Sequence, residues 1–395
     1  MRAILVYYMV EQLRLDQQRA SLIFGLYTAY AFLTPIIGGV LADKWLGRRR
    51  SVLIGGAIMA AGHLMMASEP LFYVALVTIA TGNGLFLPSL PSQINGLYRP
   101  EDPRRHLAYN YYYVGANLGG FLAPLGVGTI GEIFGWHWGF TLAGFGMLAG
   151  LVIYTAGQRY LPPDVVEPGT AKSLAVAPTD SRAVLRRFVL LFGVAAMAVI
   201  FRTAYEQVGN TLPLWIEGTE RHVGSWVIPM TWFQSLNPLF IFLLTPLVTR
   251  HWMRLSRVGK EPSSIRKMSV GAATVAVSYL ALAVVAAWSN SHHSVASWLW
   301  VAGFFALMTA GELYILPVGL GLFGRLSPAR YTATGIALWF LAAFGGNLAA
   351  GALGMLWSNL SAPRFFCAVA GVATLAAVGL LFFDGAIGRA MEDEG

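Results

Sequence analysis

Residues 21–50 read SLIFGLYTAYAFLTPIIGGVLADKWLGRRR. The run from Ser21 to Ala42 contains no charged residue, and its length is close to the roughly 20 residues with which an α-helix spans a bilayer. A short charged segment, Asp43 to Arg50, separates it from the next apolar run. Long apolar runs joined by short charged connections are typical of a polytopic α-helical membrane protein.

The whole chain repeats this pattern. Of its 395 residues, 56% are hydrophobic and 12% are charged, whereas soluble domains carry about 25% charged residues. Met1 to Val10 is long enough for only part of a span, so we predict a partial first span followed by eleven full ones. The full spans lie near residues 21–42, 51–68, 71–96, 108–134, 137–157, 186–216, 226–249, 268–288, 297–324, 331–357 and 362–383.

The placement of the basic residues predicts the orientation. Of the 27 Lys and Arg residues, 21 fall in alternate loops on one side, four fall on the other side and two lie within spans. Cytoplasmic loops carry the excess of Lys and Arg in membrane proteins. We therefore expect both termini in the cytoplasm and an inner, cytoplasmic-type cell membrane. The net charge of +8 then follows from topology and does not indicate nucleic-acid binding.

An internal repeat indicates two similar halves. The segment GNGLFLP at Gly82 resembles GELYILP at Gly311, and GANLGG at Gly115 resembles GGNLAA at Gly345. The two offsets agree within one residue, and duplicated halves are a transporter architecture. We predict an N-terminal bundle over residues 1–157, a proline-rich cytoplasmic linker over 158–185 and a C-terminal bundle over 186–395.

Charged residues inside the predicted spans mark a functional site. Each costs about 2.5–3.5 kcal/mol to insert, so each needs a partner or a water-filled cavity. Glu206 follows Arg202 by four residues, which places both on one helix face where they can pair. The pair is either purely structural or contains a protonatable carboxylate suited to proton coupling.

Glu312 is the second candidate. It has no basic residue within a helical turn and lies near Pro317, which favours a bend. A lone carboxylate there suits a cationic group such as a peptide amino terminus. The alternative is a buried, protonated glutamate that bonds to a neighbouring helix. Asn117, Asn237 and Asn347 are expected to form interhelical hydrogen bonds.

The connection after residue 37 contains closely spaced glycines, an acid and a basic run. Its notable residues are Gly38, Gly39, Asp43, Lys44, Gly47, Arg48 and Arg49. Glycines allow two helices to approach closely. The segment resembles the cytoplasmic gate signature of the major facilitator superfamily. A simple positive-inside anchor would not require the glycines or Asp43.

Further motifs, spread over nearly the whole chain, carry a more specific resemblance. They are MRAILV at Met1, LTPIIGG at Leu33, GNGLF at Gly82, DPRR at Asp102, WHWGF at Trp136, YEQ at Tyr205, FQSLNP at Phe233, Glu312 to Leu320, and WFL at Trp339. In this order they resemble the proton-dependent oligopeptide transporter family. The resemblance implies the major facilitator fold and co-transport of di- and tripeptides with protons by alternating access.

The resemblance also assigns roles by position. Glu206 is similar to the proton-coupling acid of the family, and Glu312, Asn117 and Asn237 to its pocket for the peptide amino terminus. Arg2 is similar to the first-helix arginine near the peptide carboxylate. Trp339 is expected to line a side-chain pocket. Apart from the resemblance, the aromatic surface around Tyr113 makes this residue a further candidate for substrate contact.

Three features depart from the family pattern. The first-helix motif E-x-x-E-R-F-x-Y-Y-G is absent, through either a late-assigned start codon or a genuine loss, so we expect a truncated first helix. Leu87 and Ser89 replace the fourth-helix lysine and asparagine, and Phe32 stands where many relatives have tyrosine. We hypothesise that Arg202 supplies the charge that is missing at Leu87.

Other functions remain as alternatives. They are a major facilitator carrier for an amino acid, nitrate or a drug, and a non-transporting receptor-like paralogue. We expect no enzyme, because no catalytic set, metal-ligand cluster or phosphate-binding loop is evident. The expected partners are small peptides, protons and the lipid bilayer, with no cofactor beyond the coupling proton. We expect a monomer.

Overall fold

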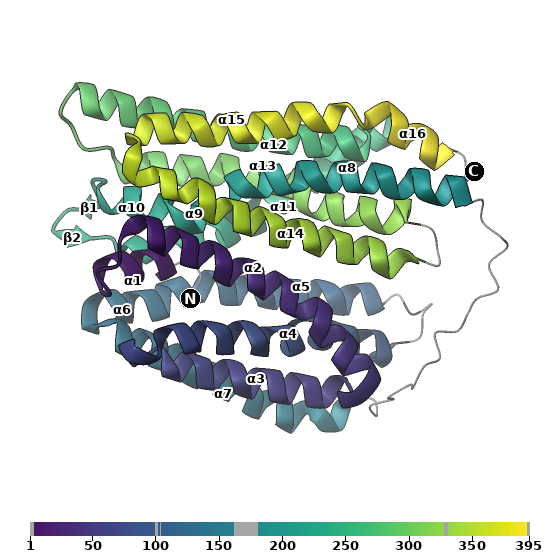
Figure 1. Ribbon diagram of the computed structural model, residues 1–395, viewed down its shortest axis with the longest axis horizontal. Helices are drawn as coiled ribbons and strands as arrows, with labels where there is room; N and C mark the ends of the chain where they lie inside the picture. The colour runs from purple at the N-terminus through teal and green to yellow at the C-terminus, as the bar shows by residue number, and fades with distance from the viewer. Residues whose placement is uncertain (1–3, 99–101, 103, 162–180, 328–330, 393–395) are drawn as a thin grey trace. The chain divides into compact units, whose positions relative to one another are not determined.

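The computed structural model describes residues 4–98, 102, 104–161, 181–327 and 331–392 (Figure 1). Arg2 and most of the predicted linker lie outside these ranges. Ten helical segments of the described chain are long and apolar enough to cross a membrane. Helix α3 (Arg48–Met65) occupies the remaining predicted full span and is not among the ten, since it begins with three arginines. The predicted all-α membrane fold is confirmed.

The described chain forms two compact units. Unit 1 covers residues 27–161, and unit 2 covers residues 4–26 together with 181–392. The boundary near the N-terminus falls within α2 (Gln17–Leu41), so the first part of this helix belongs to unit 2.

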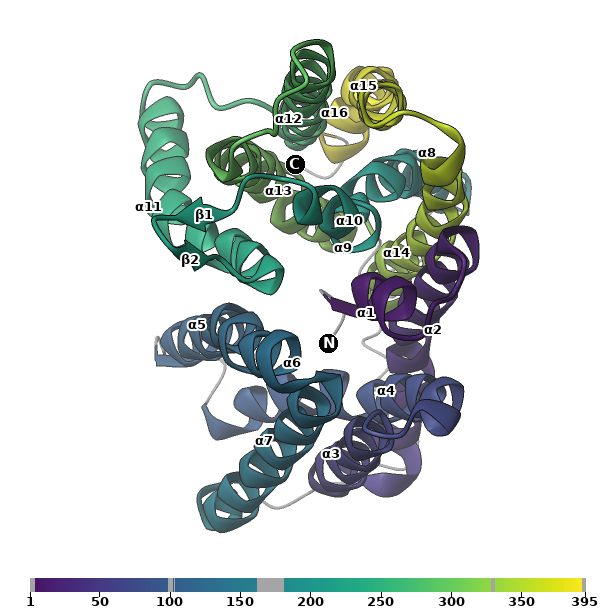
Figure 2. The ribbon, with the colours of Figure 1, turned by 90° about the vertical axis from the view of Figure 1, so that its left-hand side faces the viewer.

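Unit 1 is built around α3. On either side of α3 pack α4 and α7, and α4 also contacts α5 (Figure 2). The bounds are α4 Phe72–Leu97, α5 Arg104–Ala123, α6 Thr129–Phe134 and α7 Trp136–Gly157. A π-helical turn, Pro124–Gly128, joins α5 to α6, so one predicted span is divided into three segments.

Unit 2 contains the main hydrophobic core. In this unit α12 lies between α13 and α15, and α14 packs on α8 (Figure 2). The helix bounds are α1 Leu5–Glu11, α8 Ser181–Tyr205, α9 Gln207–Asn210, α10 Leu212–Glu217, α11 Leu236–Arg257, α12 Ser264–Ser291, α13 Trp298–Leu326, α14 Thr332–Gly354, α15 Ala362–Leu381 and α16 Asp384–Glu392.

One predicted span begins and ends in the wrong place. The span was expected at 226–249, but residues 226–227 are strand β2 (Trp226–Val227), paired with β1 (His222–Val223) in a hairpin. Gly224 turns this hairpin with a φ of 64°, a conformation that glycine adopts readily. Helix α11 then continues to Arg257, because helical hydrogen bonding extends through polar sequence beyond the apolar run.

Each unit contains an equivalent close contact between a glycine of one helix and a glycine of the neighbouring helix. In unit 1 a Cβ added at Gly82 of α4 would lie 2.6 Å from the carbonyl oxygen of Gly55 on α3. In unit 2 a Cβ added at Gly311 of α13 would lie 2.6 Å from the carbonyl oxygen of Gly271 on α12. Gly82 and Gly311 begin the two matching segments of the repeat, so the repeat in sequence corresponds to a repeat in helix packing.

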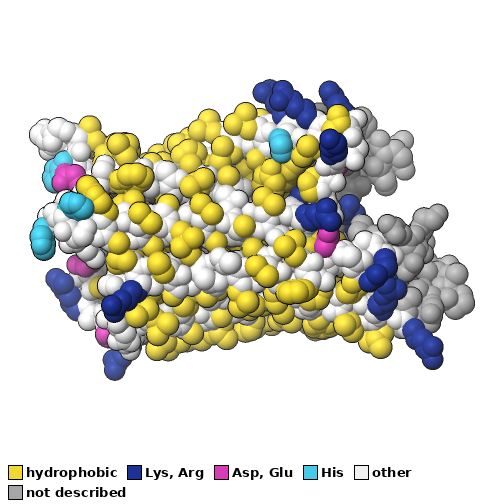
Figure 3. Space-filling model, turned by 90° about the horizontal axis from the view of Figure 1, so that it is seen from above, with side chains coloured by type: hydrophobic (Ala, Val, Ile, Leu, Met, Phe, Trp, Pro, Cys, Tyr) yellow, Lys and Arg dark blue, Asp and Glu magenta, His cyan; other side chains and the backbone are white. Residues whose placement is uncertain are grey.

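Side-chain chemistry follows a membrane pattern on the face drawn in Figure 3. Hydrophobic side chains cover its middle, and Lys and Arg gather toward the ends. Among the hydrophobic side chains exposed in the described chain are Val152, Ile153, Val284 and Leu299. Lipid can cover such residues without a penalty that water would impose.

Candidate functional site

The predicted ion pair between Arg202 and Glu206 is present. Arg202 lies near the end of α8. Its guanidinium donates a hydrogen bond to Glu206 Oε1 at 3.0 Å. The Glu206 side chain is only 1% exposed and that of Arg202 is 12% exposed. Removing one partner of such a buried pair leaves an uncompensated charge, which is far more costly than losing an exposed pair.

Arg202 has further neighbours in unit 2. Its guanidinium lies 5.9 Å from the centre of the Tyr205 ring, and it interacts electrostatically with Glu312. Gly346 of α14 provides the space for the Arg202 side chain, since a Cβ there would overlap Arg202 Cβ. Arg202 therefore pairs directly with Glu206, and its charge also attracts that of Glu312.

Glu312 is held from a neighbouring helix. Asn237, near the start of α11, donates its amide to Glu312 Oε2 at 2.6 Å and to Thr309 Oγ1 at 3.1 Å. Thr309 and Glu312 are three residues apart on α13 and so lie on one face. The expected interhelical role of Asn237 is confirmed. In contrast, Asn117 and Asn347 donate to carbonyls four residues earlier in their own helices.

A second polar cluster was missed by sequence reasoning. Gln207 and Asn210 both donate to the Ala350 carbonyl of α14, at 2.9 and 3.1 Å. Asn210 Oδ1 accepts from Ser21 of α2 at 2.8 Å, and Gln17 donates to Ser21 and to the Gly354 carbonyl. These contacts join the first part of α2 to α9 and α14. Gln207 and Asn210 follow Glu206 at a helical spacing, and this pattern in the sequence could have predicted the cluster.

Trp339 lies in the core of unit 2. It is 6% exposed, packs against Gly319 and contacts the Phe323 ring, with ring centres 5.2 Å apart and the ring planes tilted by 57°. Asn117 and Tyr113 lie on α5 in unit 1, where the Asn117 amide donates to the Tyr113 carbonyl at 2.9 Å. Tyr113 is 50% exposed. Arg2 lies outside the described residues.

The predicted gate motif forms a tight connection within unit 1. Residues Ala42–Leu46 make a π-helical turn, and Gly47 adopts a φ of 76° before α3 begins at Arg48. Arg48 lies 3.9 Å from Asp43 and donates to the Ser92 carbonyl at 3.1 Å, and Arg49 bonds to the Leu161 carbonyl.

Two of the three glycines of the motif, Gly38 and Gly39, differ in their surroundings. Gly38 touches the Gly84 backbone of α4 so closely that a Cβ would overlap it, which confirms the predicted close approach at this position. At Gly39 the prediction is wrong, because a Cβ there would make only ordinary contact with Pro88, at 3.9 Å. An alanine at position 39 would therefore leave the helix packing unchanged.

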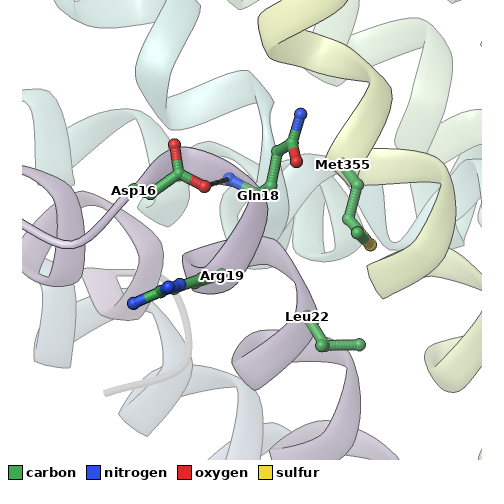
Figure 4. Close-up of a pocket in the computed structure, with 5 residues that line it drawn as sticks. All are labelled: Asp16, Gln18, Arg19, Leu22 and Met355. Atoms are coloured by element: carbon green, nitrogen blue, oxygen red, sulfur yellow. Dashed lines mark hydrogen bonds between the residues drawn. The ribbon is translucent and has the colours of Figure 1, made fainter.

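Two open pockets in unit 2 lie away from the predicted site residues. One, of about 330 Å³, is lined by Asp16, Gln18, Arg19, Leu22 and Met355 (Figure 4). The Asp16 carboxylate accepts a hydrogen bond from the backbone N–H of Gln18 there and so caps the start of α2. The other, of about 460 Å³, lies among α1, α10 and the residues after α14. Neither contains Glu206 or Glu312.

Comparison with known proteins identifies the family. The sequence profile of the POT family matches residues 49–164 and 164–364, which is more than half of the chain. This chain belongs to the POT family. Membership confirms the predicted family and shows a transporter rather than an enzyme.

The relatives cover almost the full chain. The peptide transporter YePEPT of Yersinia enterocolitica subsp. palearctica is 32% identical over 86% of this chain and 80% of its own. The di-/tripeptide transporter of Lactococcus lactis subsp. cremoris is 31% identical over 87% and 82% of the respective chains. A crystal structure of a peptide transporter POT with sulfate is 28% identical, with a TM-score of 0.91 over 99% of this chain and 92% of that one.

Proposed function

We propose that this chain is a secondary active transporter that carries di- and tripeptides together with protons by alternating access. The observation that carries the proposal is the buried Arg202–Glu206 pair, whose arginine also interacts with Glu312. Similar proteins named peptide transporters support the substrate class.

Glu206 is the coupling acid in this proposal. Its carboxylate is buried and bonded to Arg202, so a proton on Glu206 cancels the ion pair and leaves the arginine charge for Glu312. Proton arrival at one carboxylate thereby changes the electrostatic surroundings of the other. This is the physical requirement for coupling a proton to a bound charged substrate.

Glu312 receives the peptide amino terminus, and Asn237 keeps its carboxylate oriented. The family resemblance adds Asn117, Arg2 and Trp339 as further substrate contacts. Tyr113 is a further aromatic contact, and Arg202 replaces the charge that is absent at Leu87. Residues 38–49 serve as the cytoplasmic gate. We further propose a monomer in the inner, cytoplasmic-type membrane, with both termini inside, two helix bundles at 1–157 and 186–395, and a linker at 158–185.

Uptake of labelled dialanine into proteoliposomes tests the proposal, with the outside either acidic or at the internal pH. A gradient of one pH unit drives about tenfold accumulation for each coupled proton. We expect the wild-type protein to accumulate dialanine above equilibrium, and Glu206→Gln to reach only equilibrium while still exchanging peptide for peptide.

Glu217→Gln is the matched control. Glu217 also pairs with an arginine four residues away, in this case the later residue Arg221, at 2.8 Å, but the Glu217 side chain is 38% exposed. This variant should accumulate dialanine as the wild type does. Full accumulation by Glu206→Gln would remove Glu206 from the coupling role, and absence of dialanine uptake by the wild type would contradict peptide transport.

A further inference from the structure

One exposed face of α11 changes from apolar to basic along its length. Leu243, Leu247, Arg250, Arg254 and Arg257 follow one another at intervals of four, three, four and three residues. At 100° per residue these positions fall within an arc of about 80°. All five residues are exposed, with Leu243 55% and Leu247 57% accessible. We call these five residues the α11 face.

Contacts on the opposite side of α11 fix the orientation of the helix about its axis. The Trp252 ring packs edge-on against Tyr314 of α13, with ring centres 5.1 Å apart. Lys267 of α12 places its ammonium 4.6 Å from the centre of the Trp252 ring. About three helical turns earlier, Ile241 is buried on the same side of the helix. The arginines are therefore directed away from the core of unit 2.

The acids near this end of α11 are bound to other cations. Glu261 bonds to Lys267, and Asp384 bonds to Arg266 at 2.7 Å and to the Ser263 hydroxyl. The Lys267 hydrogen bond holds the pKa of the Glu261 carboxyl below its usual range. Within the described chain no ion pair involves Arg250, Arg254 or Arg257.

The charge exceeds what the helix itself requires. The carboxyl end of a helix carries about half a negative charge, which one nearby cation neutralises. The α11 face has three guanidinium groups at this end. Guanidinium binds phosphate oxygens in a planar, bidentate geometry, so an unneutralised arginine pair suits a phosphate group.

We propose that the α11 face binds an anionic phospholipid, with its phosphate at Arg250 and Arg254 and an acyl chain along Leu243 and Leu247. Seven residues of helix separate Leu243 from Arg250, or roughly 10 Å along the axis. A phospholipid presents its charge and its hydrocarbon over such a distance, whereas a free phosphate offers nothing to the two leucines. The apolar half of the face therefore selects a lipid as the occupant.

The test compares lipid affinity of the purified full chain in detergent, measured by native mass spectrometry. The probes are dioleoyl phosphatidylglycerol, dioleoyl phosphatidylcholine and glycerol phosphate. We expect the wild type to prefer phosphatidylglycerol. The double variant Arg250→Gln with Arg254→Gln should reduce that affinity about 25-fold, since each arginine near anionic lipid contributes about fivefold. Because the purified protein is in detergent, a change in its orientation in the cell membrane cannot affect the measured affinity.

A charge-relocated variant is the control. It combines the two glutamine changes with Thr249→Arg and Met253→Arg, which restore the net charge on an adjacent exposed side of α11. Its affinity should remain low. The proposal is overturned if the relocated variant regains wild-type affinity, if the wild type binds both lipids equally, or if glycerol phosphate competes as well as the lipid does. Thermal unfolding without lipid checks that both variants are folded.

Discussion

At the scale of single residues, the contacts of Asn237 organise the proposed amino-terminus pocket. Its amide reaches two acceptors on α13, a carboxylate at 2.6 Å and a hydroxyl at 3.1 Å. Hydrogen bonds to charged groups are worth about 1.5–3 kcal/mol, and those between neutral groups about 0.5–1.5 kcal/mol. The Glu312 contact is therefore expected to dominate the energetics of Asn237.

Asn237→Ala should weaken peptide transport more than Thr309→Val does. We expect Asn237→Ala to raise the KM for dialanine by at least about tenfold, because the carboxylate loses an orienting charge-assisted bond. Thr309→Val preserves the shape of the side chain and removes only the weaker contact. The KM of this variant for dialanine should therefore rise by less than about fivefold. Equal effects of the two variants would contradict a specific role for the Asn237–Glu312 bond.

At the scale of helices, glycine determines how closely α12 and α13 approach. A Cβ at Gly311 would meet the Gly271 carbonyl oxygen at 2.6 Å and Val275 Cγ2 at 2.8 Å. Backbone cannot move as easily as a flexible side chain, so this contact resists any larger residue. The equivalent contact between Gly55 and Gly82 places α3 against α4 in unit 1.

Gly311→Ala should lower stability by about 1–3 kcal/mol through overpacking. The matched control is Gly303→Ala on the same helix, where a Cβ would meet nothing within 4 Å. Alanine should leave that position unchanged or stabilise it by up to about 1 kcal/mol, because glycine is a poorer helix former. Thermal unfolding midpoints in detergent give the comparison, and an unchanged midpoint for Gly311→Ala would contradict the close packing.

At the scale of the whole molecule, basic residues follow a single rule along the chain. Alternate connections between the spans predicted from the sequence, together with the helix ends that border them, carry 21 of the 27 Lys and Arg residues. The connection between α11 and α12 belongs to the basic set, whereas the connection between α12 and α13 contains His292 and His293 and no Lys or Arg. The proposed orientation follows from this difference.

Single-cysteine labelling tests that orientation. In a Cys367→Ser background, Val258→Cys should react with a membrane-impermeant maleimide only after the cell membrane is opened. Val295→Cys should react in intact cells. Both valines are well exposed, at 64% and 58%, so accessibility to the reagent is matched. The reverse labelling pattern would overturn the cytoplasmic assignment of the termini.

The sequence by itself determined the membrane class, the approximate spans and the Arg202–Glu206 pair. These features depend on local properties: the length of an apolar run, and a helical period that brings residues four apart onto one face. The same reasoning failed at residues 226–229, where a short hairpin precedes α11, and at Gly39. It also did not reveal that Asn117 and Asn347 bond within their own helices.

Only the tertiary structure decided which helices supply the partners of the buried polar groups. Asn237 and Glu312 are 75 residues apart, and Ser21 and Asn210 are 189 apart. Apolar helix surfaces are nearly equivalent in a bilayer, so hydrophobic pattern does not specify which helices pack together. Close glycine contacts and hydrogen bonds specify those neighbours, and they form only when two particular helix faces meet.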